Sequence, residues 1–167
     1  MWESVRSKFE KYPARMRVAG KMVDLGLRVG EDHKIYCGEL KISDLALAKV
    51  ANVDRKAIKS TIDFILDDED LTKIFGNILP AGTLLKNIAK NLGLGVIEIE
   101  VGSENIGILA AATDLISKEG ISIRQAYASD IQLEETPTLT IITEDNISGD
   151  LIKDFLKIKG VIRVLIY

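Results

Sequence analysis

The amino-acid sequence predicts an α+β protein with a helical N-terminal module and a C-terminal module of alternating strands and helices. The first observation is charge: residues 1–66 carry 13 Lys/Arg and 9 Asp/Glu, whereas residues 67–167 carry 9 and 16. The second is a pair of helical segments joined by a short turn within residues 42–66. The third is a regular change between strand and helix period in the C-terminal part. Together they predict residues 1–66 as one domain, 67–95 as a helical connector and 96–167 as a second domain.

The composition is that of an ordinary globular protein, 47% hydrophobic and 28% charged. No apolar run approaches the roughly 20 residues of a membrane span, and the N-terminal stretch WESVRSKFEKYP is too charged for a signal peptide. We therefore expect a cytoplasmic protein with no membrane partner.

Cysteine and histidine occur once each, as Cys37 and His33, so one chain can form neither a disulfide nor a Cys/His zinc cage. We expect no metal and no cofactor. A catalytic Cys37–His33 pair stays open as an alternative to a turn histidine beside a partly buried thiol. No motif places a nucleophile, a base and an orienting group together, so the sequence does not predict an enzyme.

The first module begins with helical periodicity. Apolar residues at helical spacing predict two helices, one with Trp2, Val5 and Phe9, and a second from about Ala14 with Val18, Met22, Leu25 and Val29 on one face. Pro13 suits the first turn of the second helix, where its missing amide costs little. The apolar pair Ile35–Tyr36 between polar turn residues predicts a short strand or hairpin.

Residues 42–66 carry the main signal of this module. Ser43 or Asp44 can cap a first helix, Asp54 can cap a second, and Ala51-Asn52-Val53 forms the turn between them. Asparagine tolerates the left-handed conformation that such a turn often needs. Two short helices at this spacing predict a helix-turn-helix, in a plain or a winged form.

The outward face of the second helix predicts DNA binding. Its candidate contact residues are Arg55, Lys56, Lys59 and Ser60 or Thr61. Cations reach guanine edges or phosphates in the major groove, and hydroxyls reach either. The alternative is the solvated charged face of an ordinary helical hairpin.

The connector contains two helical stretches separated by Pro80-Ala81-Gly82. Thr83 can cap the second stretch, which Gly93 ends. Its apolar stripe consists of Leu84, Leu85, Ile88, Ala89 and Leu92. We interpret the segment as a packed connector whose stripe can also pair with a second subunit.

The second module follows the order βαββαβ. Strands are predicted at 96–101, 121–128, 138–143 and 161–166, with helices near 108–119 and 151–158. This is the split arrangement of ferredoxin-like domains, in which both helices cover one face of an antiparallel sheet.

The first helix of this module follows Gly107. No Lys-Ser/Thr pair follows the glycines of this loop, and apolar residues open the helix, so neither a Walker loop nor a dinucleotide site fits. The helix N-terminus offers free amides at Gly107, Ile108 and Leu109, close to Asn105, and such amides favour a carboxylate-sized anion. The alternative is a glycine that serves only a tight turn.

Residues 96–167 resemble ACT domains, small-molecule sensors that usually bind amino acids. The resemblance rests on a strand followed by a polar pair, glycine, an aliphatic pair and a helix, and then on Glu119-Gly120-Ile121-Ser122-Ile123. It implies a ligand near the loop after the first strand, against the second strand of a neighbouring copy, and edge-to-edge pairing into a homodimer or higher homo-oligomer. The implied ligand residues are Glu104, Asn105, Gly107, Ile108 and Leu109, with Ser122 and Ile123.

The whole chain resembles the archaeal predicted regulators of amino-acid metabolism that contain an ACT domain. The resemblance is carried by VDRKAIKSTI, ILPAGTLLKNIAKNLGLGVIEI and ISIRQAYASDI. It implies an amino-acid-responsive transcriptional regulator with two partners, DNA and a small-molecule effector, expected to be an amino acid. Effector binding at the ACT dimer interface would modulate DNA binding by the helix-turn-helix. The alternative is a regulatory subunit that does not bind DNA, binds an amino acid and docks on a biosynthetic enzyme.

Overall fold

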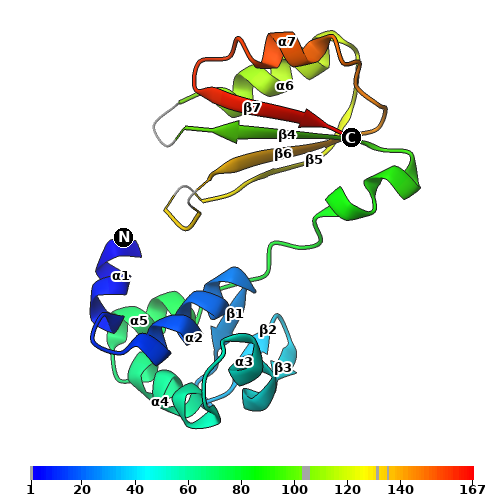
Figure 1. The fold of residues 1–167 in the computed structure, drawn as a ribbon. Helices are drawn as coiled ribbons and strands as arrows, with labels where there is room; N and C mark the ends of the chain where they lie inside the picture. Colours follow the sequence, from blue (N-terminus) through cyan, green and yellow to red (C-terminus); the bar gives the residue numbers. More distant parts are fainter. Residues whose placement is uncertain (1, 103–105, 131, 135) are drawn as a thin grey trace. The chain divides into compact units, whose positions relative to one another are not determined.

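The structure, a computed structural model, describes residues 2–102, 106–130, 132–134 and 136–167 and is mixed α+β, as predicted (Figure 1). The chain divides into two compact units, Met1–Gly82 and Thr83–Tyr167. The division falls within the predicted connector, which is therefore shared between the units.

The first unit combines helices with a small three-stranded sheet. In chain order its elements are α1 (Trp2–Phe9), α2 (Pro13–Asp24), β1 (Leu27–Val29), β2 (Ile35–Cys37), β3 (Leu40–Ile42), α3 (Asp44–Val50), α4 (Arg55–Leu66) and α5 (Glu69–Phe75). The strands are antiparallel, in the order β1-β2-β3. The strand expected around Ile35 and Tyr36 is β2, which pairs on both sides.

The core of the first unit includes α5. Leu71 and Phe75 of this helix are fully buried among apolar side chains from α1, α2, α3 and α4. The centroid of the Phe75 ring lies 6.2 Å from that of Phe9, which in turn lies 5.2 Å from that of Phe64. Aromatic rings attract one another edge to face at these separations. Residues 69–75 are thus part of the first hydrophobic core rather than of a separate connector.

The second helix ends earlier than its apolar spacing predicted. α2 stops at Asp24, Leu25 is 47% exposed, and Val29 lies in β1 instead of on the helix. Gly26 takes φ of 63°, a left-handed conformation that suits glycine and ends a helix. A Cβ at Gly26 would stand 2.7 Å from the Cα of Pro80, so the close approach of the chain at Pro80 also requires glycine.

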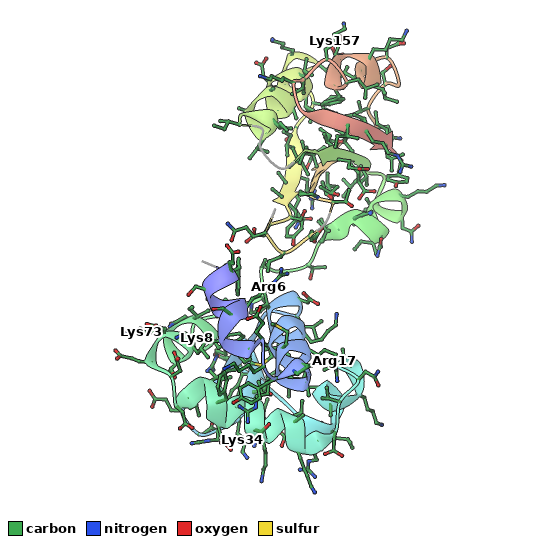
Figure 2. All side chains as sticks on the ribbon, turned by 60° about the vertical axis from the view of Figure 1, so that its left-hand side comes forward. Arg6, Lys8, Arg17, Lys34, Lys73 and Lys157 are labelled. Atoms are coloured by element: carbon green, nitrogen blue, oxygen red, sulfur yellow. The ribbon has the colours of Figure 1, made fainter. Side chains whose placement is uncertain are left out.

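Asp68 caps α5 and joins it to α1. Its carboxylate accepts hydrogen bonds from the Leu71 amide at 3.0 Å and from Lys8 Nζ at 2.7 Å (Lys8 is labelled in Figure 2). The Lys8 hydrogen bond is the main reason why the pKa of Asp68 lies below its ordinary value, and the Leu71 amide adds to the effect. A carboxyl group with a lowered pKa in the folded state stabilises the fold above its usual pKa. That contribution is lost as the pH falls through the lowered value.

We expect Asp68→Ala to destabilise the first unit by about 1 kcal/mol at neutral pH, the usual cost of removing an N-cap. The difference from the wild type should shrink below about pH 4, where carboxyl groups become protonated. Urea denaturation followed by the fluorescence of Trp2, the only tryptophan, measures this at each pH. Asp68→Asn keeps the cap acceptor without the charge and should fall between the two. A difference that is the same at pH 7 and pH 3 would contradict the assignment.

The second unit has the predicted order of strands and helices. Its elements are two short 3₁₀ turns, η1 (Leu85–Asn87) and η2 (Ala89–Leu92), followed by β4 (Gly95–Val101), α6 (Ile108–Lys118), β5 (Ile123–Ala128), β6 (Thr138–Thr143), α7 (Leu151–Phe155) and β7 (Val161–Ile166). The four strands form one antiparallel sheet in the order β5-β6-β4-β7. The strands β5 and β7 are its edges.

Apolar side chains pack against both faces of this sheet. α6 and α7 cover one face (Figure 1), where Ile97, Ile116 and Phe155 are fully buried. On part of the other face, Ala89 and Leu94 pack against Val96 and Ile142 in a smaller cluster.

The second helix predicted for the connector is absent from these residues, which form the 3₁₀ turns η1 and η2 instead. Thr83 caps neither turn. Of the predicted apolar stripe only Ala89 is buried, while Leu84, Ile88 and Leu92 are exposed.

Candidate functional site

The α3–α4 pair has the local chemistry that its sequence predicts. The Ser43 hydroxyl accepts from the Ala46 amide at 3.1 Å, and the Asp54 carboxylate accepts from the Lys56 amide at 2.7 Å, so both helices carry side-chain N-caps. Asn52 takes φ of 51° in the turn between them. The Val53 amide donates to the Ala48 carbonyl at 3.0 Å, which closes the turn. These bonds fix how α4 leaves α3.

The outward face of α4 is positively charged over its first two turns. Arg55, Lys56 and Lys59 are exposed, and within the described residues Lys56 and Lys59 form no ion pair. The Arg55 Nε lies 4.0 Å from an Asp44 carboxylate oxygen, and the Arg55 side chain remains 68% exposed. All three cationic side chains are therefore accessible to a polyanion.

The two hydroxyl candidates on α4 differ from expectation. Thr61 is fully buried, and its hydroxyl donates to the Ala57 carbonyl at 2.7 Å. It therefore faces the core and is not available as a DNA contact, contrary to the prediction. Ser60 is partly buried, and its hydroxyl donates to the same carbonyl at 3.2 Å. A partly buried hydroxyl with a weak internal bond can still turn outward.

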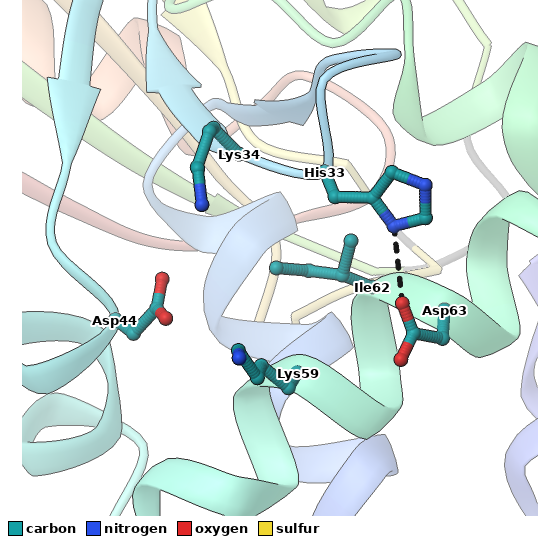
Figure 3. A pocket seen from close by; sticks show the side chains of 6 residues that line it. All are labelled: His33, Lys34, Asp44, Lys59, Ile62 and Asp63. Atoms are coloured by element: carbon teal, nitrogen blue, oxygen red, sulfur yellow. Dashed lines mark hydrogen bonds and ion pairs between the residues drawn. The ribbon is translucent and has the colours of Figure 1, made fainter.

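A cleft of about 240 Å³ lies between α4 and the turn that joins β1 to β2 (Figure 3). Its lining consists of His33, Lys34, Asp44, Lys59, Ile62 and Asp63. Lys34 and Lys59 extend toward the same space from the turn and from the helix. His33 Nδ1 lies 3.1 Å from Asp63 Oδ1, which gives that carboxylate its own partner. Among the residues described, neither Lys34 nor Lys59 has an acidic partner, so both ammonium groups remain available to an anion.

The β1–β2 turn is held in place by its own hydrogen bonds. The Gly30 amide donates to the Lys34 carbonyl at 2.8 Å, and the Tyr36 hydroxyl donates to Asp32 at 2.7 Å. The hydrogen bond from Tyr36 lowers the pKa of Asp32. Lys34 was not among the sequence candidates, because it joins the α4 face only through the tertiary packing of this turn.

The single cysteine takes no part in this cleft. Cys37 is partly buried, and it packs against the first core. No group of three or more metal-ligating side chains occurs in the part of the chain that the structure describes.

The second candidate site is a pocket of about 210 Å³ at the N-terminus of α6. It is lined by Val101, Gly107, Ile108, Leu109, Ala128, Ser129, Pro137, Thr138 and Leu139. The first backbone bond of the helix runs from the Ala111 amide to the Gly107 carbonyl, so the amides of Ile108 and Leu109 have no acceptor inside the helix. Gly107 takes φ of 87°, and a Cβ there would meet no atom within 4 Å. The pocket is therefore open beside the glycine and mainly apolar elsewhere.

The structure gathers three of the predicted ligand residues, Gly107, Ile108 and Leu109, at this pocket. Glu104 and Asn105 lie outside the described residues. Ile123 is the first residue of β5 and Ser122 precedes it, whereas β5 contributes to the pocket only through its last residue, Ala128. Within one chain they are thus not part of the pocket.

Residues 128–129 and 137–139 line the pocket without having been predicted. The Ser129 hydroxyl accepts from the Thr138 amide at 2.8 Å, which ties the end of β5 to the start of β6. Only strand pairing brings these residues to α6, and no local sequence signal marks them.

No helix among the described residues is long and apolar enough to cross a membrane. No protein-family model matches the chain, and no curated protein matches it.

Proposed function

We propose that the chain is a transcriptional regulator that binds DNA through its first unit and an amino acid through its second. The observation that carries the proposal is the capped α3–α4 pair, whose second helix exposes Arg55, Lys56 and Lys59. A helix-turn-helix inserts its second helix in the major groove and contacts bases from the N-terminal residues of that helix. The three cations lie in the first five residues of α4, where such contacts are made.

The cleft beside α4 supports the same proposal. Phosphate contacts position a protein on DNA and base contacts specify the sequence. Lys34 of the β1–β2 turn and Lys59 of α4 approach one space from two elements, which suits a backbone phosphate flanking the groove. Two carboxylates also line this cleft: Asp63 lies 3.1 Å from His33, and Asp44 lies 4.0 Å from Arg55.

The second unit supports a sensing role. Its βαββαβ order and its pocket at the α6 N-terminus agree with the resemblance to ACT domains. Free amides suit a carboxylate, and the apolar lining suits an aliphatic side chain. Within the described residues the outer edge of β5 pairs with no other strand, which leaves it available for edge-to-edge pairing in a homodimer.

The DNA-binding half is tested by fluorescence anisotropy with a labelled duplex at several salt concentrations. Phosphate contacts make the logarithm of the association constant fall linearly with the logarithm of salt, by about 0.9 per contact. We expect a slope of several units. Binding that is absent at low salt, or that does not respond to salt, would contradict the proposal.

The sensing half is tested by a thermal-shift screen against the twenty amino acids and common 2-oxo acids. A ligand at 100 times its dissociation constant adds about 2.7 kcal/mol of stability. We expect one class of ligand to raise the melting temperature of the wild type and Leu109→Asp to abolish the shift, because a carboxylate at the pocket repels an anion. Leu109→Asn is the matched uncharged control and should retain part of the shift. Gly107 is a poor choice for this test, because its positive φ strains any other residue.

A second function is favoured by a cavity of about 440 Å³ between α1 and α5, in which the apolar Val5, Leu71 and Ile74 are flanked by Ser4, Lys8, Asp70 and Lys73. Such a surface suits docking on a protein, as in a regulatory subunit of a biosynthetic enzyme. Docking of this kind would respond little to salt and would not require Lys56 or Lys59. The salt series therefore separates the two functions.

A further inference from the structure

Residues 83–94, called here the strap, enter the second unit across the sheet face that α6 and α7 leave free. Ala89 and Leu94 of the strap are buried against Val96 of β4 and Ile142 of β6. The strap begins at the residue where the chain divides into its two units. Detachment of the strap from the sheet would therefore lengthen the segment that links the two units.

Gln125 of β5 fastens the first residues of the strap. Its side-chain Oε1 accepts from the Leu85 amide at 3.0 Å, and its Nε2 donates to the Thr83 carbonyl at 2.9 Å. One amide side chain thus satisfies two backbone groups, as a neighbouring strand would. Gln125 directly follows the point at which the register of β5 against β6 shifts. Its side chain therefore leaves the edge strand at an irregularity in the strand pairing.

A second tie lies one residue further along the strap. Lys86 Nζ lies 2.5 Å from Glu98 Oε1, and the hydroxyl of Tyr167 donates to Glu98 Oε2 at 2.8 Å. Burial pushes the pKa of Glu98 upward, but the hydrogen bonds from Lys86 and Tyr167 outweigh it and leave the pKa below its ordinary value. Glu98 is therefore a charged anchor for Lys86 at neutral pH.

Beyond these polar ties, the strap is held to the sheet by the small apolar cluster that contains Ala89 and Leu94. Its backbone forms two short 3₁₀ turns, and Leu84, Ile88 and Leu92 remain exposed. Segments with few buried apolar contacts open locally at low free energy. The polar ties at Gln125 and Glu98 thus carry much of the attachment at the N-terminal end of the strap.

We infer that the strap is a detachable tether, latched by Gln125 and Glu98, whose opening lengthens the connection between the two units. When the strap is closed, only Ala81 and Gly82 separate Pro80, which packs on Gly26, from Thr83. Complete opening, in which Ala89 and Leu94 also leave the sheet, adds the twelve residues 83–94 to the tether. The effective concentration of one linked site at another falls roughly as the −3/2 power of tether length, so opening weakens two-site engagement. For a dimer on two DNA half-sites, a consequence that rests on the proposed function, the open strap lowers affinity.

Hydrogen exchange of the full-length protein tests the latch directly. Gln125→Ala should accelerate amide exchange in peptides covering 83–90 at least tenfold while the amides of β4 and β6 stay protected. Trypsin should cleave after Lys86 and Lys90 correspondingly faster. Gln132→Ala removes the only other glutamine, whose side chain lies outside the strap, and should behave as the wild type. Unchanged exchange at 83–90 in Gln125→Ala would overturn the inference.

A second pair of variants covers the case in which Gln125→Ala fails to fold. Lys86→Met removes the tie to Glu98, and Lys90→Met is its matched control on the same strap. Faster exchange at 83–90 in Lys86→Met alone supports the latch, and equal exchange in both variants overturns it.

DNA affinity separates this inference from the proposed function. A wild type that binds no DNA removes the proposed function, while the exchange data still decide whether the latch exists. A wild type that binds a two-half-site duplex should lose affinity severalfold on Gln125→Ala. Unchanged affinity in a variant whose strap exchanges rapidly would overturn the role of the tether.

Discussion

Phe75→Ala is expected to destabilise the first unit by about 3–5 kcal/mol, the usual cost of truncating a buried phenylalanine. The side chain is fully buried and its ring contacts that of Phe9, so the cavity left behind opens in the middle of the first core. A small domain has roughly 5–15 kcal/mol of stability in total. The substitution therefore brings the unit close to unfolding, and a fragment that ends at Leu66 should not fold at all.

The fluorescence of Trp2 makes this measurement specific to one unit. It is the only tryptophan, and it packs against the first core. Urea denaturation followed at this residue reports the first unit even if the second unfolds separately. Phe155→Ala is the matched control, because Phe155 is equally buried in the core of the second unit. An unchanged Trp2 transition in Phe75→Ala would show that α5 is dispensable to the first core.

The local chemistry of the α3–α4 pair was predictable because each of its signals acts over a few residues. The caps at Ser43 and Asp54 and the left-handed turn at Asn52 depend only on side chains beside the backbone groups they serve. The alternation of strands and helices after residue 95 was predictable for a similar reason. Apolar residues recur every second residue in a strand with one buried face and at helical spacing in a helix with one buried face.

The position of the division between the units was not predictable from charge. The change of sign falls at 67–70, and these acidic residues belong to the start of α5. Asp68 caps that helix, and Glu69 and Asp70 lie in its first turn, where negative charge complements the helix dipole. The charge run therefore marks a helix N-terminus inside the first unit.

Features that depend on tertiary packing could not be predicted from the sequence either. Thr61 follows the partly exposed Ser60, and adjacent positions on a helix point in directions different enough that one side chain is in the core and the other is not. Lys34 meets Lys59 only after the β1–β2 turn packs beside α4, and Ser129 reaches the α6 pocket only through its pairing with Thr138. The pocket residues Ile108 and Leu109 were predictable because a helix N-terminus is a local feature.

Replacing Lys56 and Lys59 together by alanine is expected to weaken DNA binding by at least tenfold near 0.1 M salt and to reduce the salt slope by about 2, if each contacts one phosphate. Both side chains are exposed on α4, and neither forms an ion pair within the described residues, so the double variant should keep the stability of the wild type. Lys153→Ala with Lys159→Ala removes the same charge from exposed positions of the second unit and serves as the matched control. Loss of affinity in both double variants would indicate a general effect of net charge. Loss in the α4 variant alone, with a smaller slope, would identify α4 as the DNA-contacting helix, because only groups that displace counterions from the duplex change that slope.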